Sequence, residues 1–256
     1  MAKVKTLILR APGTNCNEET AFAFEQAGAE ATHVHVNRLI KRTERLSDYQ
    51  IVVVPGGFTY GDDISAGKVL ANELKLNLGE EIAAFIERGG LMLGICNGLQ
   101  VLVKAGILPH PTRSEAPAVT LSANDSARFE CRWVYLKANP ESPCILTQGI
   151  DRIYLPVANG EGKVVADDEL LNSPNVALKY TDEAGNTGAG YPYNPSGSLG
   201  DTAGICDATG RIFALMPHPE RYLRGTQHPR WTREGAKEHG DGFKIFQNAV
   251  KWAAQA

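Results

Sequence analysis

Short runs of apolar, largely β-branched residues alternate with amphipathic stretches through the first hundred residues. The apolar runs predict strands at 4–10, 31–36, 49–57 and 91–95. The amphipathic stretches predict helices at 19–28, 80–88 and 97–106, which end at or just before glycine. Strands that are apolar throughout and are separated by helices are typical of a parallel sheet covered on both faces. The sequence therefore predicts a three-layer α/β fold with a mostly parallel sheet.

The second half of the chain has a different pattern. After Pro109, prolines and serines separate short strand-like segments. These segments lie at 128–138, 152–159, 175–180, 203–208 and 211–219. They predict antiparallel additions and long loops around the same sheet, followed by an amphipathic closing helix at 241–255. Because no repeat, low-complexity tract or linker interrupts the chain, we expect residues 1–256 to form a single domain.

Composition excludes several classes of protein. The 256 residues carry a formal net charge of -3, which does not provide the basic surface that sequence-independent nucleic-acid binding needs. No segment approaches the roughly 20 apolar residues of a membrane-spanning helix, so we expect a soluble, cytoplasmic protein. The five cysteines are an odd number without a CxxC pair, and we expect neither a metal site nor a disulfide framework.

One cysteine is distinguished by its neighbours. Gly94-Ile95-Cys96-Asn97-Gly98 has the form G-x-C-x-G and lies between a predicted strand and a predicted helix. It is the thiol counterpart of the nucleophile elbow, where small residues relieve crowding at a strained strand-to-helix turn. The helix N-terminus favours a thiolate, and the Asn97 N–H could bind an oxyanion. The alternative is a core cysteine whose glycine neighbours only permit close packing.

A cysteine nucleophile needs a base, and His218 is the candidate. It follows a predicted strand, lies between Pro217 and Pro219, and precedes Glu220 by two residues. The prolines predict an extended segment, in which residues i and i+2 face the same side. Glu220 could then bind one ring nitrogen and leave the other free, as in a nucleophile–histidine–acid triad. The alternative is a rigid loop with a surface ion pair.

A second oxyanion donor is predicted where another strand ends. Pro55-Gly56-Gly57 follows an apolar run, and ligand sites of parallel α/β sheets lie beyond the carboxyl ends of the strands. Glycine N–H groups there can approach a tetrahedral oxygen without obstruction by side chains. The alternative is an ordinary tight turn.

These segments together resemble the class I, or triad, glutamine amidotransferases. The resemblance is carried by GICNGLQ (94–100), MPHPE (216–220) and PGGFTYGDD (55–63), which occur in the family's order. Three further stretches resemble the glutaminase subunits of phosphoribosylformylglycinamidine synthases, which serve purine biosynthesis. They are PGTNCNEE (12–19), NDSARFECRWV (124–134) and LPVANGEGK (155–163), so that the resemblance covers nearly the whole chain.

The resemblance implies a role for each site residue. Cys96 would attack the side-chain amide of glutamine, His218 would transfer the proton, Glu220 would orient His218, and the N–H groups of Gly57 and Asn97 would bind the oxyanion. The glutamine pocket would be lined by Gly56, Gln100, Asn159, Gly160 and Glu161. The ammonia would pass to an ATP-dependent synthetase subunit that holds the ATP and magnesium and converts formylglycinamide ribonucleotide to formylglycinamidine ribonucleotide. A small accessory subunit is a further expected partner, and this chain would hold no cofactor.

Two other functions remain open at this point. The first is a stand-alone γ-glutamyl hydrolase or peptidase with the same fold, and the second is a scaffold that has lost the chemistry. The polar segment 223–242 is either a solvated loop or a contact to a partner. Because no base is adjacent in sequence to Cys16, Cys131, Cys144 or Cys206, these four cysteines are expected to be structural.

Overall fold

A nine-stranded sheet runs through the computed structural model, which describes residues 3–109 and 118–255. The strand order is β2-β1-β3-β4-β11-β10-β9-β6-β7. The first five strands in this order are parallel, with bounds β2 (Glu30–His35), β1 (Lys5–Arg10), β3 (Ile51–Val54), β4 (Leu91–Ile95) and β11 (Ile212–Leu215). β3, β4 and β11 are buried along their whole length, which explains their continuous apolar runs.

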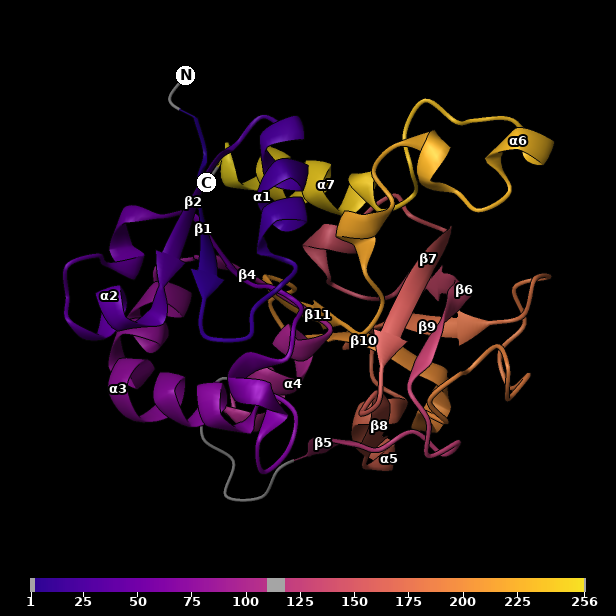
Figure 1. Ribbon diagram of the computed structural model, residues 1–256, viewed down its shortest axis with the longest axis horizontal. Coiled ribbons are helices and arrows are strands. Elements are labelled where there is room, and N and C mark those ends of the chain that lie inside the picture. Colours follow the sequence, from indigo (N-terminus) through magenta and orange to yellow (C-terminus); the bar gives the residue numbers. More distant parts are fainter. Residues whose placement is uncertain (1–2, 110–117, 256) are drawn as a thin grey trace.

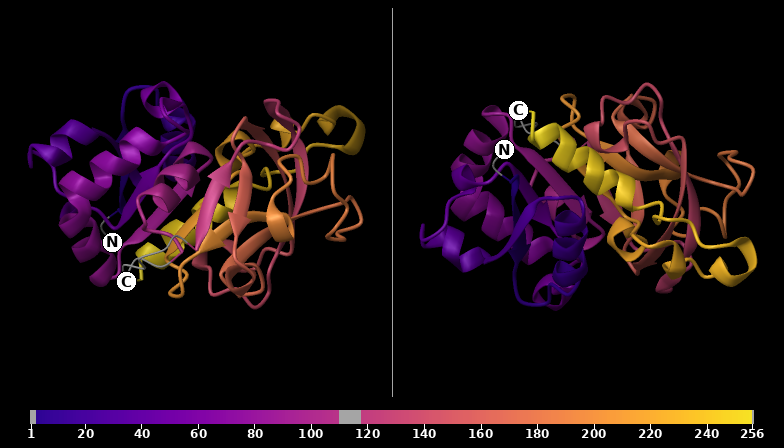
Figure 2. Two further views of the ribbon diagram at one scale, coloured as in Figure 1. Left: turned by 90° about the horizontal axis from the view of Figure 1, so that it is seen from below. Right: turned by 90° about the horizontal axis from the view of Figure 1, so that it is seen from above.

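The second half of the chain extends this sheet with antiparallel strands, as predicted. They are β10 (Thr202–Cys206), β9 (Val176–Thr181), β6 (Glu130–Ala138) and β7 (Arg152–Asn159). β5 (Val119–Ser122) and β8 (Lys163–Ala166) form a separate two-stranded sheet. Figure 1 shows the antiparallel strands in orange and pink beside the indigo and purple strands β1 to β4, and Figure 2 shows the same division from two other sides.

Helices cover the parallel half on both faces. α1 (Asn17–Gln26) and α7 (Phe243–Ala253) lie together on one face, where the rings of Phe24 and Phe246 meet edge to face at 5.1 Å. α3 (Lys68–Glu87) and α4 (Asn97–Lys104) pack on the other face (Figure 1). The shorter helices are α2 (Val36–Ile40), α5 (Asp168–Leu171) and α6 (Trp231–Glu234). Six 3₁₀ turns complete the described elements: η1 (Leu46–Asp48), η2 (Thr59–Asp62), η3 (Ile145–Thr147), η4 (Leu199–Asp201), η5 (Pro219–Arg221) and η6 (Gly225–Gln227).

Two predicted elements differ from the structure. The helix predicted at 80–88 is only the second half of α3, which begins at Lys68. α3 continues through Gly79 because Leu70, Leu74, Leu78 and other apolar residues bury one face of the helix, and this burial outweighs the low helix propensity of one glycine. The segment around Glu220 is a 3₁₀ turn, η5, and not an extended strand end. Pro219 occupies the first position of η5, where its fixed φ suits a helical turn.

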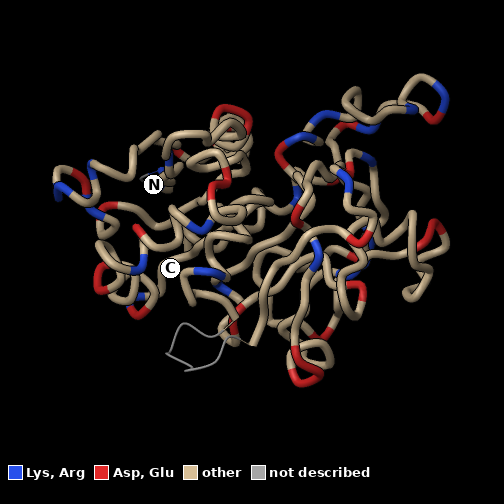
Figure 3. The backbone as a smooth tube through the Cα atoms, turned by 60° about the horizontal axis from the view of Figure 1, so that its bottom comes forward, with Lys and Arg blue, Asp and Glu red and all other residues tan. Residues whose placement is uncertain are grey.

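Polar segment 223–242 is partly ordered. It contains η6 and α6, and Arg224 bridges to His239 within it. Figure 3 shows acidic and basic residues interspersed along this segment and along the rest of the tube. Among residues 3–109 and 118–255, none of the helices combines the length and the apolarity that crossing a bilayer would require.

The topology gathers four loops at one edge of the sheet. β1, β3, β4 and β11 are consecutive neighbours and parallel, so their carboxyl ends lie side by side. These ends lead into the segments 11–16, 55–58, 96–97 and 216–218. The predicted nucleophile, base and oxyanion turn are all in these segments.

Candidate active site

The chain turns sharply at Cys96, between β4 and α4. Its φ of 51° and ψ of -104° form a conformation that residues with side chains rarely adopt. A Cβ on Gly94 would lie 2.8 Å from the carbonyl oxygen of Gly98, and a Cβ on Gly98 would collide with the carbonyl oxygen of Val54. The glycines of the G-x-C-x-G pattern therefore permit a strained turn with the thiol at its apex.

Hydrogen bonds hold this turn against two strands. The Cys96 N–H donates to the Leu215 carbonyl in β11 at 2.8 Å, and Sγ lies 3.7 Å from the Ala158 carbonyl oxygen in β7. The thiol is buried, with 5% of Cys96 exposed. α4 begins at the next residue, Asn97, and the first N–H groups of a helix have no intrahelical partner. Cys96 is therefore the N-cap residue of α4, at the positive end of the helix dipole.

His218 and Glu220 form a buried pair. His218 Nδ1 lies 2.7 Å from Glu220 Oε1, and both side chains are almost fully excluded from solvent. The His218 backbone N–H donates to the Pro156 carbonyl oxygen at 2.8 Å, which anchors the residue against β7. In residues 3–109 and 118–255, Nε2 of His218 has no hydrogen-bond partner. One ring nitrogen is thus held by the carboxylate, and the other is free for proton transfer.

Electrostatics favour the charged form of this histidine. Burial of the ring lowers its pKa, but the charges of Glu220 and Cys96 and the sulfurs of Cys16 and Cys96 raise the pKa well above the ordinary 6.5. The raised pKa favours the imidazolium form of His218. The surface ion pair considered from the sequence is excluded, because the pair is buried.

The Gly56-Gly57 turn lies beside the His218 ring. A Cβ on Gly56 would lie 2.9 Å from Cε1 of His218. Gly57 has φ +153, and a Cβ there would lie 2.7 Å from the Gly13 carbonyl oxygen. The structure thus brings both predicted glycines to the edge of the sheet that carries Cys96. The oxyanion roles of Gly57 and Asn97 stay predictions.

The side chain of Asn97 connects the nucleophile turn to two other segments. Its Oδ1 accepts hydrogen bonds from Thr59 N–H at 3.2 Å and Thr59 Oγ1 at 2.7 Å. Its Nδ2 donates to Asp62 Oδ1 at 3.0 Å and to Gln100 Oε1 at 2.9 Å. Gln100 Nε2 in turn donates to the Glu161 carbonyl oxygen at 2.6 Å. Both polar groups of Gln100 are therefore bonded within the protein, and its contact with glutamine stays a prediction.

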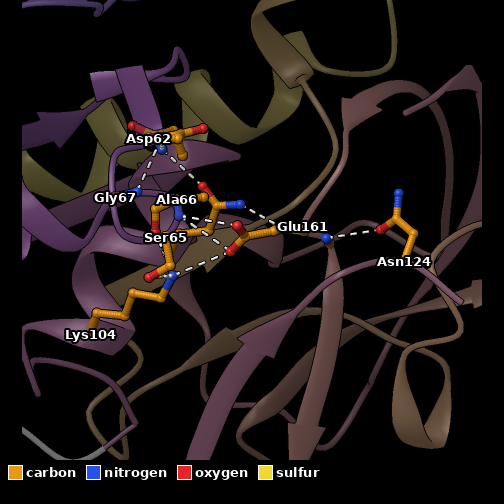
Figure 4. A network of polar contacts seen from close by, with 10 residues as sticks. Asp62, Ser65, Ala66, Gly67, Lys104, Asn124 and Glu161 are labelled. Atoms are coloured by element: carbon orange, nitrogen blue, oxygen red, sulfur yellow. Dashed lines mark hydrogen bonds and ion pairs between the residues drawn. The ribbon is translucent and has the colours of Figure 1, made fainter. Parts of the chain in front are cut away.

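Glu161 belongs to the same network, which Figure 4 shows from close by. Its carboxylate accepts a hydrogen bond from Ala66 N–H and lies 3.5 Å from Lys104 Nζ. Lys104 also donates to Ser65 Oγ at 3.0 Å and to the Ala66 carbonyl oxygen at 2.6 Å. Burial lowers the pKa of Lys104 and raises that of Asp62, because each is partly removed from water. Glu161 thus binds loop 62–67 to α4.

Asn159 and Gly160 lie at the end of β7, next to Ala158 and its contact with the thiol. Asn124 holds this segment: its Nδ2 donates to the Asn159 carbonyl oxygen at 2.8 Å, and its N–H donates to the Gly160 carbonyl oxygen at 3.0 Å. The side-chain amide of Asn159 is buried and has no hydrogen-bond partner in the described parts of the chain. A Cβ on Gly162 would collide with Oδ1 of Asn159, so this amide lies against the segment that follows β7. The contact of Asn159 with glutamine stays a prediction.

Sequence reasoning missed two residues of the site. Cys16 was expected to be structural, because no base is adjacent in sequence. In the fold its sulfur accepts a hydrogen bond from Arg221 Nη2 at 3.1 Å, and Cys16, His218 and Glu220 place ligand atoms within 4.8 Å of one another. The signals were present: Cys16 follows β1 at the carboxyl edge of the sheet, and Arg221 directly follows Glu220.

Such a cysteine–histidine–glutamate cluster could hold a metal ion, but its contacts favour proton chemistry. The Nδ1–Oε1 separation of 2.7 Å is that of a hydrogen bond between His218 and Glu220. The Arg221 guanidinium at the Cys16 sulfur places a positive charge where a cation would have to bind. We therefore assign no metal to these residues.

The site combines a strained cysteine with a buried histidine–glutamate pair and a glycine turn at one edge of a parallel sheet. This combination is typical of hydrolases and amidotransferases that carry their nucleophile on a strand-to-helix elbow. Residues 3–253 match the model of the CobB/CobQ-like glutamine amidotransferase domain. The chain therefore belongs to this family.

Particular relatives are similar over the full length. The phosphoribosylformylglycinamidine synthase subunit PurQ of Dehalococcoides mccartyi is 60% identical over 255 residues, which cover 100% of both chains. The protein of the same name from Methanococcus maripaludis is 43% identical, with 97% of each chain covered. Among solved structures, a chain from the structure of PurLQS from Thermotoga maritima has a TM-score of 0.76 and 31% identity, covering 98% of this chain and 99% of that one.

Proposed function

We propose that this chain is the glutaminase subunit of a phosphoribosylformylglycinamidine synthase, which hydrolyses glutamine to glutamate and ammonia for purine biosynthesis. Full-length similarity to the PurQ subunits supports the assignment at the level of the whole chain. The observation that carries the chemistry is the strained Cys96 beside a buried His218 whose Nδ1 is held by Glu220.

The reaction follows from these three residues. The Cys96 thiolate attacks the carboxamide carbon of glutamine, and the tetrahedral oxygen is bound by the N–H groups of Gly57 and Asn97. His218 gives its proton to the leaving amine, so that ammonia departs and a γ-glutamyl thioester remains on Cys96. His218 then takes a proton from water, which attacks the thioester and releases glutamate. Glu220 keeps the ring oriented and stabilises its charged form.

The glutamine pocket is assigned to the segments around the nucleophile. Gly56 lies against the His218 ring, and Gly160 and Glu161 follow the Ala158 carbonyl that faces the Cys96 sulfur. The unpartnered amide of Asn159 is the strongest candidate contact of this group, since it has hydrogen-bonding capacity to offer. Gln100 supports the pocket by fixing the backbone of Glu161.

The partners follow from the same assignment. The ammonia is delivered to a synthetase subunit that binds ATP and magnesium, and a small accessory subunit completes the complex, while this chain itself carries no cofactor. The similar chain from Thermotoga maritima belongs to a structure of PurLQS, a name that supports a multisubunit assembly. We place the complex in the cytoplasm. We also treat residues 1–256 as one domain, which the continuous sheet supports.

The test compares glutamine with free ammonia in the assembled complex. Cys96→Ala should abolish synthesis from glutamine and leave synthesis from ammonium salts intact, because only the glutaminase half is lost. Retained use of glutamine would contradict the assignment of Cys96. Rapid glutamine hydrolysis by the isolated wild-type chain, with no stimulation by a synthetase, would instead identify a stand-alone γ-glutamyl hydrolase.

A further inference from the structure

Cys16 is fixed in place by its backbone. It directly precedes α1, its N–H donates to the Gly56 carbonyl oxygen at 3.1 Å, and its own carbonyl oxygen accepts a hydrogen bond from Thr20 Oγ1 at 2.6 Å. The residue is buried, with 1% of its surface exposed. The loop between β1 and α1 therefore binds the Gly56-Gly57 turn and presents a sulfur beside it.

The sulfur lies against the catalytic histidine. A Cβ built on Gly56 would be 3.1 Å from Sγ of Cys16 and 2.9 Å from Cε1 of His218, so the α-carbon of Gly56 is flanked by both. The sulfur, one ring nitrogen of His218 and one oxygen of Glu220 all lie within 4.8 Å of one another.

Arg221 holds this sulfur from the other side. Its Nη2 donates to Sγ at 3.1 Å, and its Nε lies 3.9 Å from a carboxylate oxygen of Glu19 on α1. Burial lowers the pKa of Arg221, but the negative charges of Cys16 and Glu220 raise it by more, so that the pKa of Arg221 lies above its ordinary value. The Cys16 sulfur also donates to Asn15 Oδ1 at 3.1 Å. It is thus held between Asn15 and a charge-assisted hydrogen bond from Arg221.

We propose that Cys16, held by Arg221, is a positioning residue for His218: it fixes the ring opposite Cys96 and stabilises the imidazolium without itself attacking substrate. The proposal rests on the proposed function and deepens it at the same site. The titratable and charged groups around the ring are Glu220 and Arg221 from η5, Cys96 from the β4–α4 turn and Cys16 from the β1–α1 loop. Arg221 acts on the ring through Cys16, whose sulfur it holds in place.

The first experiment separates positioning from mere packing. Cys16→Ala and Cys16→Ser are compared with Cys144→Ala, which removes an equally buried thiol that lies outside the site. We expect Cys16→Ala to lower kcat for glutamine in the partner-bound complex by roughly 10-fold with little change in KM, below the ~10²–10⁴-fold of a complete acid–base contribution. Cys16→Ser, which keeps a polar atom at the position, should recover part of the loss, and Cys144→Ala should match the wild type.

The pH profile provides a readout that packing alone would not change. Loss of Cys16 removes one group that stabilises the imidazolium, so the alkaline limb of kcat/KM should move to lower pH in Cys16→Ala. Arg221→Met should lower kcat as Cys16→Ala does, because it releases the sulfur, and Arg221→Lys, which keeps a cation there, should reduce that loss. The double variant Cys16→Ala/Arg221→Met should be no worse than the more impaired single variant, since the two residues act as a unit.

Three results would overturn the proposal: a wild-type pH profile in Cys16→Ala, multiplicative losses in the double variant, or equal losses in Cys16→Ala and Cys144→Ala. Complete inactivity of Cys16→Ser, together with a γ-glutamyl adduct on Cys16 of the wild-type chain, would also overturn it, because Cys16 would then be a nucleophile. Cys96→Ala is measured in parallel. If Cys96→Ala still uses glutamine, the proposed function fails; if only Cys16→Ala is unaffected, the positioning role alone fails.

Discussion

Replacing Gly98 by alanine should displace the nucleophile turn, whereas the same change at Gly79 should stabilise the chain. Both glycines lie inside helices, Gly98 in α4 and Gly79 in α3, so both gain the same intrinsic helix propensity. A Cβ on Gly79 would meet nothing within 4 Å. A Cβ on Gly98 would collide with the carbonyl oxygen of Val54 at the end of β3, which is backbone and cannot rotate away.

The magnitudes follow from these two environments. Gly79→Ala should raise the free energy of unfolding by about 0.5–1 kcal/mol, the usual difference between glycine and alanine inside a helix. Gly98→Ala gains the same amount but adds an overpacking penalty of roughly 1–3 kcal/mol. The clash therefore decides whether Gly98→Ala raises or lowers the free energy of unfolding, and we expect it to lower it. Because α4 carries Cys96 at its start, a shift of about 1 Å away from β3 should lower kcat/KM by about 10²-fold.

Urea denaturation of both variants measures the first effect, and glutamine-dependent synthesis in the assembled complex measures the second. Gly79→Ala is the matched control, because it makes the same substitution inside a helix at an exposed position. Equal stabilisation by the two substitutions, or full activity of Gly98→Ala, would refute the requirement for glycine at the contact with Val54. The explanation of the G-x-C-x-G pattern would fail with it.

Four other predictions concern the same site. A glutamine-mimicking electrophile should label Cys96 ahead of the other four cysteines, and mass spectrometry that finds Cys16 labelled first would contradict this. His218→Ala should lower kcat/KM more than Glu220→Gln, because the acid is the triad member whose loss matters least; equal inactivity of Glu220→Gln and Cys96→Ala would rule out a purely orienting carboxylate. The pKa of His218 is raised in the fold. Its pair with Glu220 therefore stabilises the chain fully below the unfolded pKa of about 6.5, and this contribution is lost as pH rises through the folded pKa. Glu220→Gln should therefore lower the free energy of unfolding more at about pH 6 than at strongly alkaline pH. Asp62→Asn keeps the oxygen that accepts hydrogen bonds from Asn97 and Gly67, and it should retain activity. Asp62→Ala leaves those two donors unpaired and should lower the unfolding free energy by about 1–3 kcal/mol. Identical unfolding free energies of the two variants would show that these hydrogen bonds contribute nothing to stability.

The parallel half of the sheet could be predicted because each of its buried strands is recognisable from its own short run of residues. β3, β4 and β11 are buried on both faces and therefore appear as uninterrupted apolar runs. The first half of α3 was not predicted, because Gly79 resembles a boundary until the burial of the preceding leucines is known. The contact of His218 with Glu220 was predicted correctly, although the backbone that makes it is a 3₁₀ turn.

Side-chain contacts between residues far apart in the chain could not be predicted from the sequence. Cys16 and Arg221 are separated by 205 positions, and only the adjacency of β1, β3, β4 and β11 brings their loops together. The network of Asn97 with Thr59, Asp62 and Gln100 likewise depends on how loop 59–62 folds over α4. The sequence places Cys16 after β1 and Arg221 after Glu220, but it does not pair the two residues, because each side chain could equally face solvent.

The pairing of β4 with β11 has a consequence for biosynthesis of the chain. β4 and the Cys96 turn are translated in the first half, whereas β11 and His218 arrive near the end, and the two strands pair directly, with the Cys96 N–H on the Leu215 carbonyl. Until β11 emerges from the ribosome, β4 has an unpaired edge and Cys96 has no base. Under the roles proposed for Cys96 and His218, the nascent or truncated chain is catalytically silent but exposed to strand-mediated association. The proposed activity then requires nearly the whole polypeptide.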